Sequence, residues 1–132
     1  MFSNLKNPVF TNIDDLNEMS RQIRRDIMNM LLISKSGHSG GPLGMADIFS
    51  ALYFNKLNIL PETPYMPERD FVFVSIGHIA PVWYSTLSRR GYFPLANDFA
   101  RQIVLGEPSI GCISGVIIII IHTQPGNLGA LG

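Results

Sequence analysis

At 132 residues, with 46% hydrophobic and 15% charged residues, the chain is long enough for one domain with a buried core and too apolar for a disordered protein. Ten basic residues balance ten acidic ones, so its charge gives no reason to expect nucleic acid or an anionic membrane as a partner. The one cysteine, Cys112, excludes an intrachain disulfide and favours a cytoplasmic location. We expect no signal peptide, and the longest apolar run, residues 116–121, is too short to span a membrane.

The first predicted helix begins at Asp14 or Asp15 and ends between residues 34 and 37. Either aspartate can cap it, and Asp15 with Glu18 has the spacing of a capping box. Apolar residues recur along it at steps of three and four, as in an amphipathic helix: Leu16, Met19, Ile23, Ile27 and Met30. Charged residues lie mostly off this stripe and are expected on a solvated face: Arg21, Arg24, Arg25 and Asp26.

Residues 36–44 contain four glycines, one proline and His38, a composition that predicts a loop. Glycine lets the backbone approach a ligand closely, and an imidazole can donate or accept a hydrogen bond. Taken alone, the segment is more typical of a tight turn between helices with a solvated histidine. A second loop of the same kind, around Gly77 and His78, favours a binding site instead.

A second helix is expected over residues 45–57, well buried along two apolar rows: Ile48 with Leu52, and Phe49 with Tyr53. Three prolines make residues 58–70 a surface connector. Residues 71–75 form an almost wholly apolar run with β-branched and aromatic residues, which is typical of a central parallel strand covered on both faces. The second histidine loop follows this strand, and ligands of open α/β sheets bind at the carboxyl ends of strands.

A third helix is expected over residues 81–90, where Gly91 stops it, and a fourth from Asn97 to about residue 105. Residues 116–121 form a further candidate for a buried strand. The pattern predicts an α/β fold with a partial parallel sheet flanked by helices. No linker divides residues 1–132, so we expect a single domain.

Five blocks of sequence stand in a distinctive order: residues 23–27 (IRRDI), 37–48 (GHSGGPLGMADI), 51–54 (ALYF), 67–81 (PERDFVFVSIGHIAP) and 91–94 (GYFP). Together they resemble the N-terminal, thiamine-diphosphate-binding domain of the transketolase family. The resemblance covers residues 16–106 and leans toward short or split N-terminal subunits. It rests above all on two glycine–histidine loops in the right order and spacing.

The resemblance implies the first portion of a thiamine-diphosphate-binding fold, with the cofactor at a subunit interface. It implies transfer of a two-carbon ketol unit between sugar phosphates, within the pentose phosphate pathway, using thiamine diphosphate and Mg²⁺. On the matched positions, it implies that His38 and His78 are catalytic residues. Contacts to the cofactor would come from His78, Gly126, Leu128 and Gly129.

Several positions depart from the family's pattern. Ser39 replaces a proline after the first histidine, and Ile76 replaces a lysine, which removes a positive charge. Cys112 aligns with a third histidine, and a thiol is only a weak hydrogen-bond donor. No role is assigned to His122. The family's magnesium motif and its pyrimidine-binding domain are missing, and no acidic residue follows Glu107, so we expect no metal ligands here, an apparently truncated domain, and no activity from the chain alone.

Three functions stay open. The chain is either an incomplete N-terminal part of a transketolase-type enzyme, a non-catalytic relic or partner-binding subunit, or part of an enzyme similar to deoxyxylulose-phosphate synthase. Residues 40–47 (GGPLGMAD) favour transketolase, whereas Ile76 and Cys112 favour the relic. In the first case we expect a C-terminal transketolase subunit or a homo-oligomer to complete the enzyme. A sheet with few strands also predicts an exposed apolar face and a tendency to associate.

Overall fold

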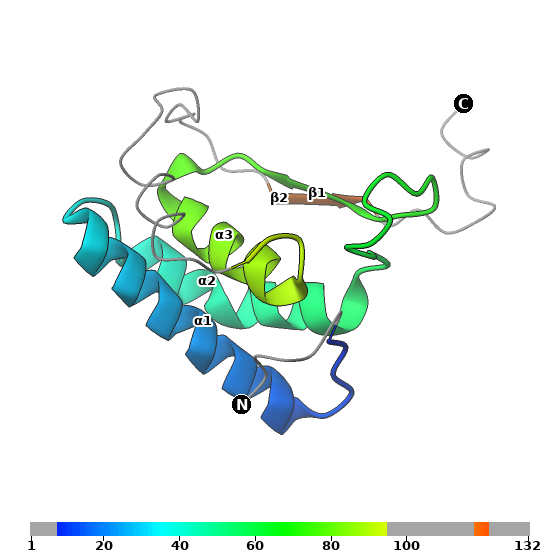
Figure 1. Ribbon diagram of the computed structural model, residues 1–132, viewed down its shortest axis with the longest axis horizontal. Helices are drawn as coiled ribbons and strands as arrows, with labels where there is room; N and C mark the ends of the chain where they lie inside the picture. The colour runs from blue at the N-terminus through cyan, green and yellow to red at the C-terminus, as the bar shows by residue number, and fades with distance from the viewer. Residues whose placement is uncertain (1–7, 95–117, 122–132) are drawn as a thin grey trace.

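The computed structural model describes residues 8–94 and 118–121. Three helices in this part of the chain pack against one another, and a pair of short strands lies across them (Figure 1). The elements in chain order are α1 (Ile13–Ser34), α2 (Gly40–Ala51) with a π-helical continuation (Leu52–Lys56), β1 (Phe71–Val74), a 3₁₀ turn (Gly77–Ile79), α3 (Ala80–Arg90) and β2 (Ile118–Ile121). The predicted fourth helix, residues 97–105, lies outside the described residues.

Helix α1 is capped by Asn12 rather than by an aspartate. The Asn12 side-chain oxygen accepts a hydrogen bond from the Asp15 backbone N–H at 2.8 Å, and its amide donates to the Asp15 carboxylate at 2.6 Å. The predicted capping box, Asp15 with Glu18, is therefore wrong, because the cap lies one helical turn earlier and joins Asn12 to Asp15. The reason is conformational, because a capping residue needs extended backbone and Asn12 has it, with φ −104° and ψ 155°.

The predicted apolar stripe of α1 is confirmed. Met19, Ile23, Ile27 and Met30 are buried, and Leu16 packs against them at the edge of the core. Residues from every other helix, from the connector and from the segment before α1 complete this core: Phe10, Ala46, Phe49, Tyr53, Phe54, Leu57, Ile59, Ile79 and Val82. One layer of three helices thus shares one apolar centre.

Helix α2 begins at Gly40, five residues before the predicted start. Glycine and proline are tolerated here because the N–H groups of a first helical turn have no partner within the helix. Pro42 is the third residue, and the first helical bond runs from Leu43 N–H to the Ser39 carbonyl at 3.0 Å. The predicted burial of two rows is wrong for Ile48, which is 48% exposed.

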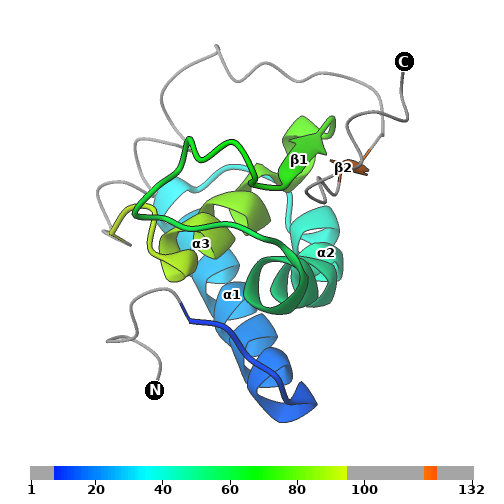
Figure 2. The ribbon, with the colours of Figure 1, turned by 90° about the vertical axis from the view of Figure 1, so that its right-hand side faces the viewer.

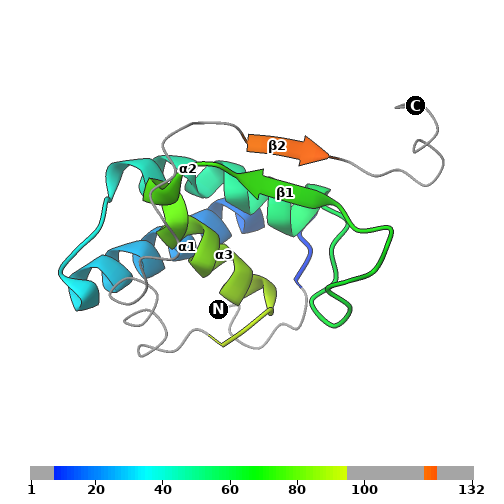
Figure 3. The same ribbon diagram turned by 90° about the horizontal axis from the view of Figure 1, so that it is seen from above.

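The two described strands pair antiparallel, with Phe71 opposite Ile121 and Val74 opposite Ile118 (Figure 3). The predicted parallel sheet is therefore not confirmed, although residues 71–74 do form a strand and residues 118–121 another. An apolar strand pairs with whichever partner reaches its open edge, and antiparallel pairing is slightly more favourable per residue than parallel pairing. Apolar runs do not encode strand direction.

The helices cover one face of β1 (Figure 2). Val72 and Val74 point to that face and pack against the core, while Phe71 and Phe73 alternate to the opposite face. Phe73 is 53% exposed, and the Arg69 guanidinium lies 4.4 Å from the centre of the Phe71 ring. Cover on both faces, which the apolar run predicted, is not found among the described residues.

Two charged side chains of α1 are not solvated as predicted. Asp26 is 6% exposed and binds Arg89 of α3, and Arg24 forms an ion pair with Asp47 of α2 at 2.8 Å. Their sequence positions, just off the apolar stripe, face the neighbouring helices at the margin of the core. Ion pairs therefore fix how α1 lies against both other helices.

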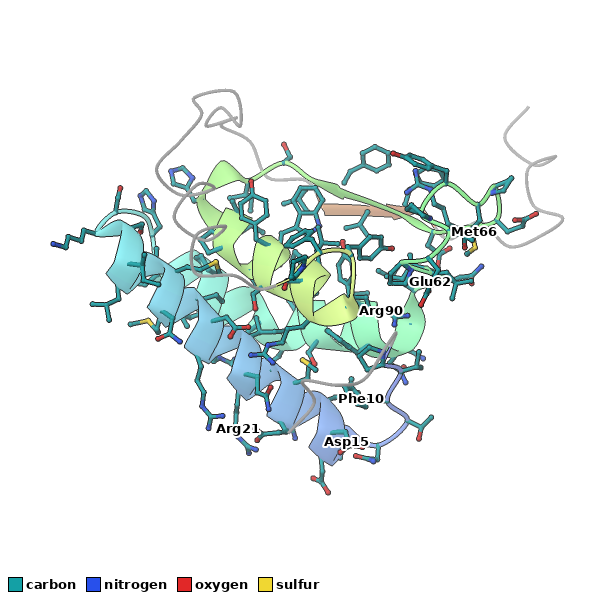
Figure 4. The ribbon with its side chains drawn as sticks, in the orientation of Figure 1. Phe10, Asp15, Arg21, Glu62, Met66 and Arg90 are labelled. Carbon is teal, nitrogen blue, oxygen red and sulfur yellow. The ribbon has the colours of Figure 1, made fainter. Side chains whose placement is uncertain are left out.

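Arg90, at the end of α3, holds two distant segments together. Its guanidinium donates to the carbonyls of Pro8 at 3.1 Å and of Ile59 at 3.2 Å. Figure 4 shows Arg90 beside the segment that carries Phe10. Burial lowers the pKa of Arg90 from its ordinary value. Gly91 then ends the helix at φ 104°, as predicted, in a conformation that favours glycine.

Candidate functional site

His38 and His78, forty positions apart in sequence, are in contact. Their ring centres lie 4.4 Å apart with the rings perpendicular, the edge of one imidazole against the face of the other. His38 belongs to the loop between α1 and α2, and His78 to the turn between β1 and α3; both segments lie at the same end of the molecule (Figure 1). Both side chains are exposed. The structure thus brings the two predicted catalytic residues together.

The loop that carries His38 is fixed by local backbone geometry. Helix α1 ends where Lys35 adopts a left-handed conformation, φ 53°, and its N–H donates to the Leu31 carbonyl at 2.9 Å. The Ser34 hydroxyl donates to the Ser36 carbonyl at 2.8 Å. Gly37 follows at φ 114°, which L side chains rarely adopt. These turns reverse the chain just before His38.

The turn that carries His78 is anchored by its neighbour Ile79, which is 2% exposed. A side-chain carbon added to Gly41 would lie only 3.1 Å from Cγ2 of Ile79, whereas at Gly40 and Gly44 it would meet nothing within 4 Å. Gly41, near the start of α2, therefore allows the β1–α3 turn to approach. The start of α2, just after the loop of His38, therefore lies against the turn of His78.

The chemistry of the site is that of imidazoles and helix N-termini. Residues 36–46 and 71–88 contain no Asp, Glu, Lys or Arg. Helices α2 and α3 both begin beside the histidines, and the N–H groups of a first helical turn carry partial positive charge. Such a site can hydrogen-bond hydroxyl groups, accept anionic oxygens and move protons through imidazole.

The remaining predicted site residues, Gly126, Leu128 and Gly129, lie outside the described residues, as do Cys112 and His122. Within residues 8–94 and 118–121, no three His, Cys, Asp or Glu side chains are grouped as a metal ion would need. None of the described helices is long and apolar enough to cross a membrane.

A cluster on α1 and α2 escaped the sequence analysis. Asp47 accepts hydrogen bonds from Arg24 at 2.8 and 3.0 Å and from the Ser20 hydroxyl. The Arg24 guanidinium first, and Ser20 second, lower the pKa of Asp47 to about 2. The one sequence signal is that Ser20 and Arg24 are one helical turn apart, so both side chains lie on the same face of α1 and can share a partner. The Gly41–Ile79 contact was missed for the same reason, because it joins residues far apart in sequence.

Comparison with known proteins places this chain in a family. The model of the transketolase thiamine diphosphate binding domain matches residues 16–104, a span that includes both histidine loops. The match begins within α1 and runs past the end of α3. It therefore takes in the three helices and β1 together.

Individual relatives agree. The chain is 37% identical over 81 residues to a 6-deoxy-6-sulfo-D-fructose transketolase subunit of Clostridium sp. (strain MSTE9). This alignment covers 61% of this chain and 30% of the relative. It is 37% identical over 89 residues to an apulose-4-phosphate transketolase subunit of Actinobacillus succinogenes, an alignment that covers 67% of this chain and 32% of the relative. It is 36% identical over 118 residues to transketolase 1 of Escherichia coli, an alignment that covers 85% of this chain and 17% of the relative. The chain thus spans a third or less of each. It belongs to the transketolase family, and its residues 16–104 are of the thiamine diphosphate binding domain type.

Proposed function

We propose that the chain contributes the His38–His78 site to a thiamine-diphosphate-dependent enzyme that transfers a two-carbon ketol unit between sugar phosphates. The observation that carries this proposal is the 4.4 Å contact between the two imidazoles, since it joins the two motifs on which the family resemblance rests. Magnesium dependence, a cytoplasmic location and a place in the pentose phosphate pathway belong to the same proposal.

The residues present fit part of the cofactor's requirements. The space beside Gly40 and Gly44 of α2 is open, because side-chain carbons added there would meet nothing within 4 Å. Thiamine diphosphate supplies, when bound, a nucleophilic carbon and an electron sink. In this proposal His38 and His78 bind substrate hydroxyl groups and exchange protons with them. Gly126, Leu128 and Gly129 would contact the cofactor.

Magnesium does not fit the described residues, which offer no group of three ligands. We therefore place its ligands in other sequence, together with the rest of the cofactor site. A partner subunit is the proposed source, because two relatives are named as transketolase subunits. A second copy of this chain, and the remaining sequence of a longer protein, are the other sources.

A second candidate function has its own support. Ile76 packs against the core directly before Gly77, where the resemblance led us to expect a lysine, so a cationic group is missing beside His78. This favours a chain that binds a partner subunit without catalysing the reaction. An enzyme similar to deoxyxylulose-phosphate synthase is the third reading, and it keeps the thiamine-dependent enzyme class but changes the reaction.

The deciding experiment is ketol transfer by the purified chain with thiamine diphosphate and Mg²⁺, alone and after mixing with the products of the adjoining reading frames. We expect no turnover alone and cofactor-dependent turnover in one mixture. His38→Ala and His78→Ala should each remove most of that turnover. Arg21→Ala, which removes an exposed side chain of α1, should leave the turnover unchanged. Turnover by the chain alone would contradict the need for a partner. A stable complex without turnover would favour the partner-binding function.

A further inference from the structure

We propose that His38 and His78 together bind one divalent transition-metal ion of the class of Ni²⁺, Zn²⁺ or Cu²⁺. Neutral imidazole is the common protein ligand for these ions. The two rings are in contact at 4.4 Å between centres, and both are exposed to solvent. This inference concerns the two side chains themselves and does not depend on the proposed ketol transfer.

The distance between the rings suits a chelate. An ion held by two imidazole nitrogens at about 2.0–2.1 Å in tetrahedral geometry places those nitrogens about 3.3 Å apart. Ring nitrogens lie one ring radius from the ring centre, so rings whose centres are 4.4 Å apart are close enough to present two nitrogens at about that spacing. Both side chains are exposed, so an ion can reach them from solvent.

The surroundings favour transition metals over Mg²⁺ and Ca²⁺. Hard cations require several oxygen ligands, chiefly carboxylates. The segments around the two histidines, residues 36–46 and 71–88, contain no carboxylate. Asp47, which follows the first segment, is held by Arg24 at 2.8 Å. The pair alone supplies two ligands, because no larger group of metal-binding side chains occurs in the described part of the chain. Water would fill the other positions, so the ion is exchangeable and open to an oxygen ligand.

Folding creates this pair. His38 is positioned by the turns at Lys35 and Gly37, and His78 by the buried Ile79 beneath Gly41. In the unfolded chain the two imidazoles are separated by forty residues. An ion that binds both of them must therefore bind the native state more tightly than the unfolded state, and it raises the unfolding temperature.

The test is calorimetric titration of the full 132-residue chain with Ni²⁺ as the only added ligand, followed by thermal unfolding with and without the ion. We expect one saturable site per chain and a higher unfolding temperature with Ni²⁺. His38→Ala and His78→Ala should each abolish both effects. Mg²⁺ at the same concentration should produce neither effect.

Two variants serve as controls, because the chain has one further histidine and one cysteine. His122→Ala and Cys112→Ser should keep the Ni²⁺ site and the thermal shift. Loss of binding in either control, or full affinity in His38→Ala or His78→Ala, would overturn the proposal, as would no saturable binding by the unaltered chain. Far-UV circular dichroism checks that each variant is folded, and the broadening of both imidazole resonances by paramagnetic Ni²⁺ gives an independent readout in the unaltered chain.

Discussion

Arg89 of α3 binds Asp26 of α1 through two parallel hydrogen bonds, from Nε to Oδ2 at 2.6 Å and from Nη2 to Oδ1 at 2.7 Å. Two further hydrogen bonds support this pair. Ser85 donates to Asp26 at 2.7 Å, and Arg89 donates to the side chain of Gln22 at 2.6 Å. The carboxylate is 6% exposed. A buried charge is stable only while its partner is present.

Replacing Asp26 by alanine should lower the free energy of unfolding by about 3 kcal/mol, because it strands the Arg89 guanidinium at a largely buried position. Urea denaturation of the variant and of the unaltered chain measures this difference. The matched control is Arg25→Ala, which breaks an ion pair with Glu18 whose arginine is 68% exposed and should cost far less, because solvent screens an exposed pair. Equal losses in the two variants would contradict the role assigned to the buried pair.

Tyr53 makes the stability of the fold vary with pH in the alkaline range. Its hydroxyl accepts a hydrogen bond from Trp83 Nε1 at 2.9 Å, and its side chain is buried. Burial raises the pKa of Tyr53 from 10 to about 12, although the Trp83 hydrogen bond acts in the opposite direction. Between pH 10 and pH 12 the unfolded chain loses the phenol proton while the folded chain keeps it. Stability is therefore complete below about pH 10 and falls as the pH rises toward 12.

The expected loss over that interval is about 2–3 kcal/mol from this group. Tyr53→Phe should remove this part of the alkaline slope, while costing about 1 kcal/mol at neutral pH through the lost partner of Trp83. Chemical denaturation at a series of pH values measures both effects. Tyr65→Phe is the control, because Tyr65 is 88% exposed, and its slope should match that of the unaltered chain. An unchanged slope in Tyr53→Phe would refute this assignment.

The elements were largely predictable from sequence, but their contacts were not. The α1 stripe and the glycine that ends α3 follow from local periodicity and backbone preference. The start of α2 was missed because glycine and proline disfavour helix interiors yet are compatible with a first turn. The Asp26–Arg89 pair and the antiparallel direction of β2 depend on long-range packing, which no local pattern encodes.

For the candidate site, sequence supplied the residues and structure supplied their proximity. His38 and His78 stood out because each follows a glycine in a loop, and the family resemblance paired them. The contact between Gly41 and Ile79, which links the two loops, joins residues whose sequence neighbours give no sign of it.

The open face of β1 should cause association. Phe73 is 53% exposed on the face opposite the helices, beside the ring of Phe71. Exposed aromatic surface on a strand favours pairing between molecules. Phe73→Thr should therefore shift sedimentation velocity profiles toward smaller species at a given concentration. Tyr65→Thr, which removes a still more exposed aromatic side chain from the connector, is the control and should leave the profile unchanged. The same shift in both variants would show that the sheet face has no special role.

Gly41 should be the most sensitive glycine of the first turn of α2. An alanine there puts a methyl group 3.1 Å from Cγ2 of Ile79, a buried side chain in the turn that carries His78, which must then shift by a few tenths of an ångström. Gly41→Ala should lower the free energy of unfolding by about 1 kcal/mol. It should also weaken Ni²⁺ binding, since His78 then moves relative to His38.

Gly40→Ala is the matched control, one residue away in the same helical turn. Its added methyl group meets nothing within 4 Å, so stability and Ni²⁺ affinity should stay at or above those of the unaltered chain. Urea denaturation and calorimetry compare the two variants directly. If Gly41→Ala behaved like Gly40→Ala in both measurements, the approach of Ile79 to α2 would not control the spacing of the histidines. If only Gly41→Ala lost stability and Ni²⁺ affinity, the absence of a side chain at this position would be what lets the two loops meet.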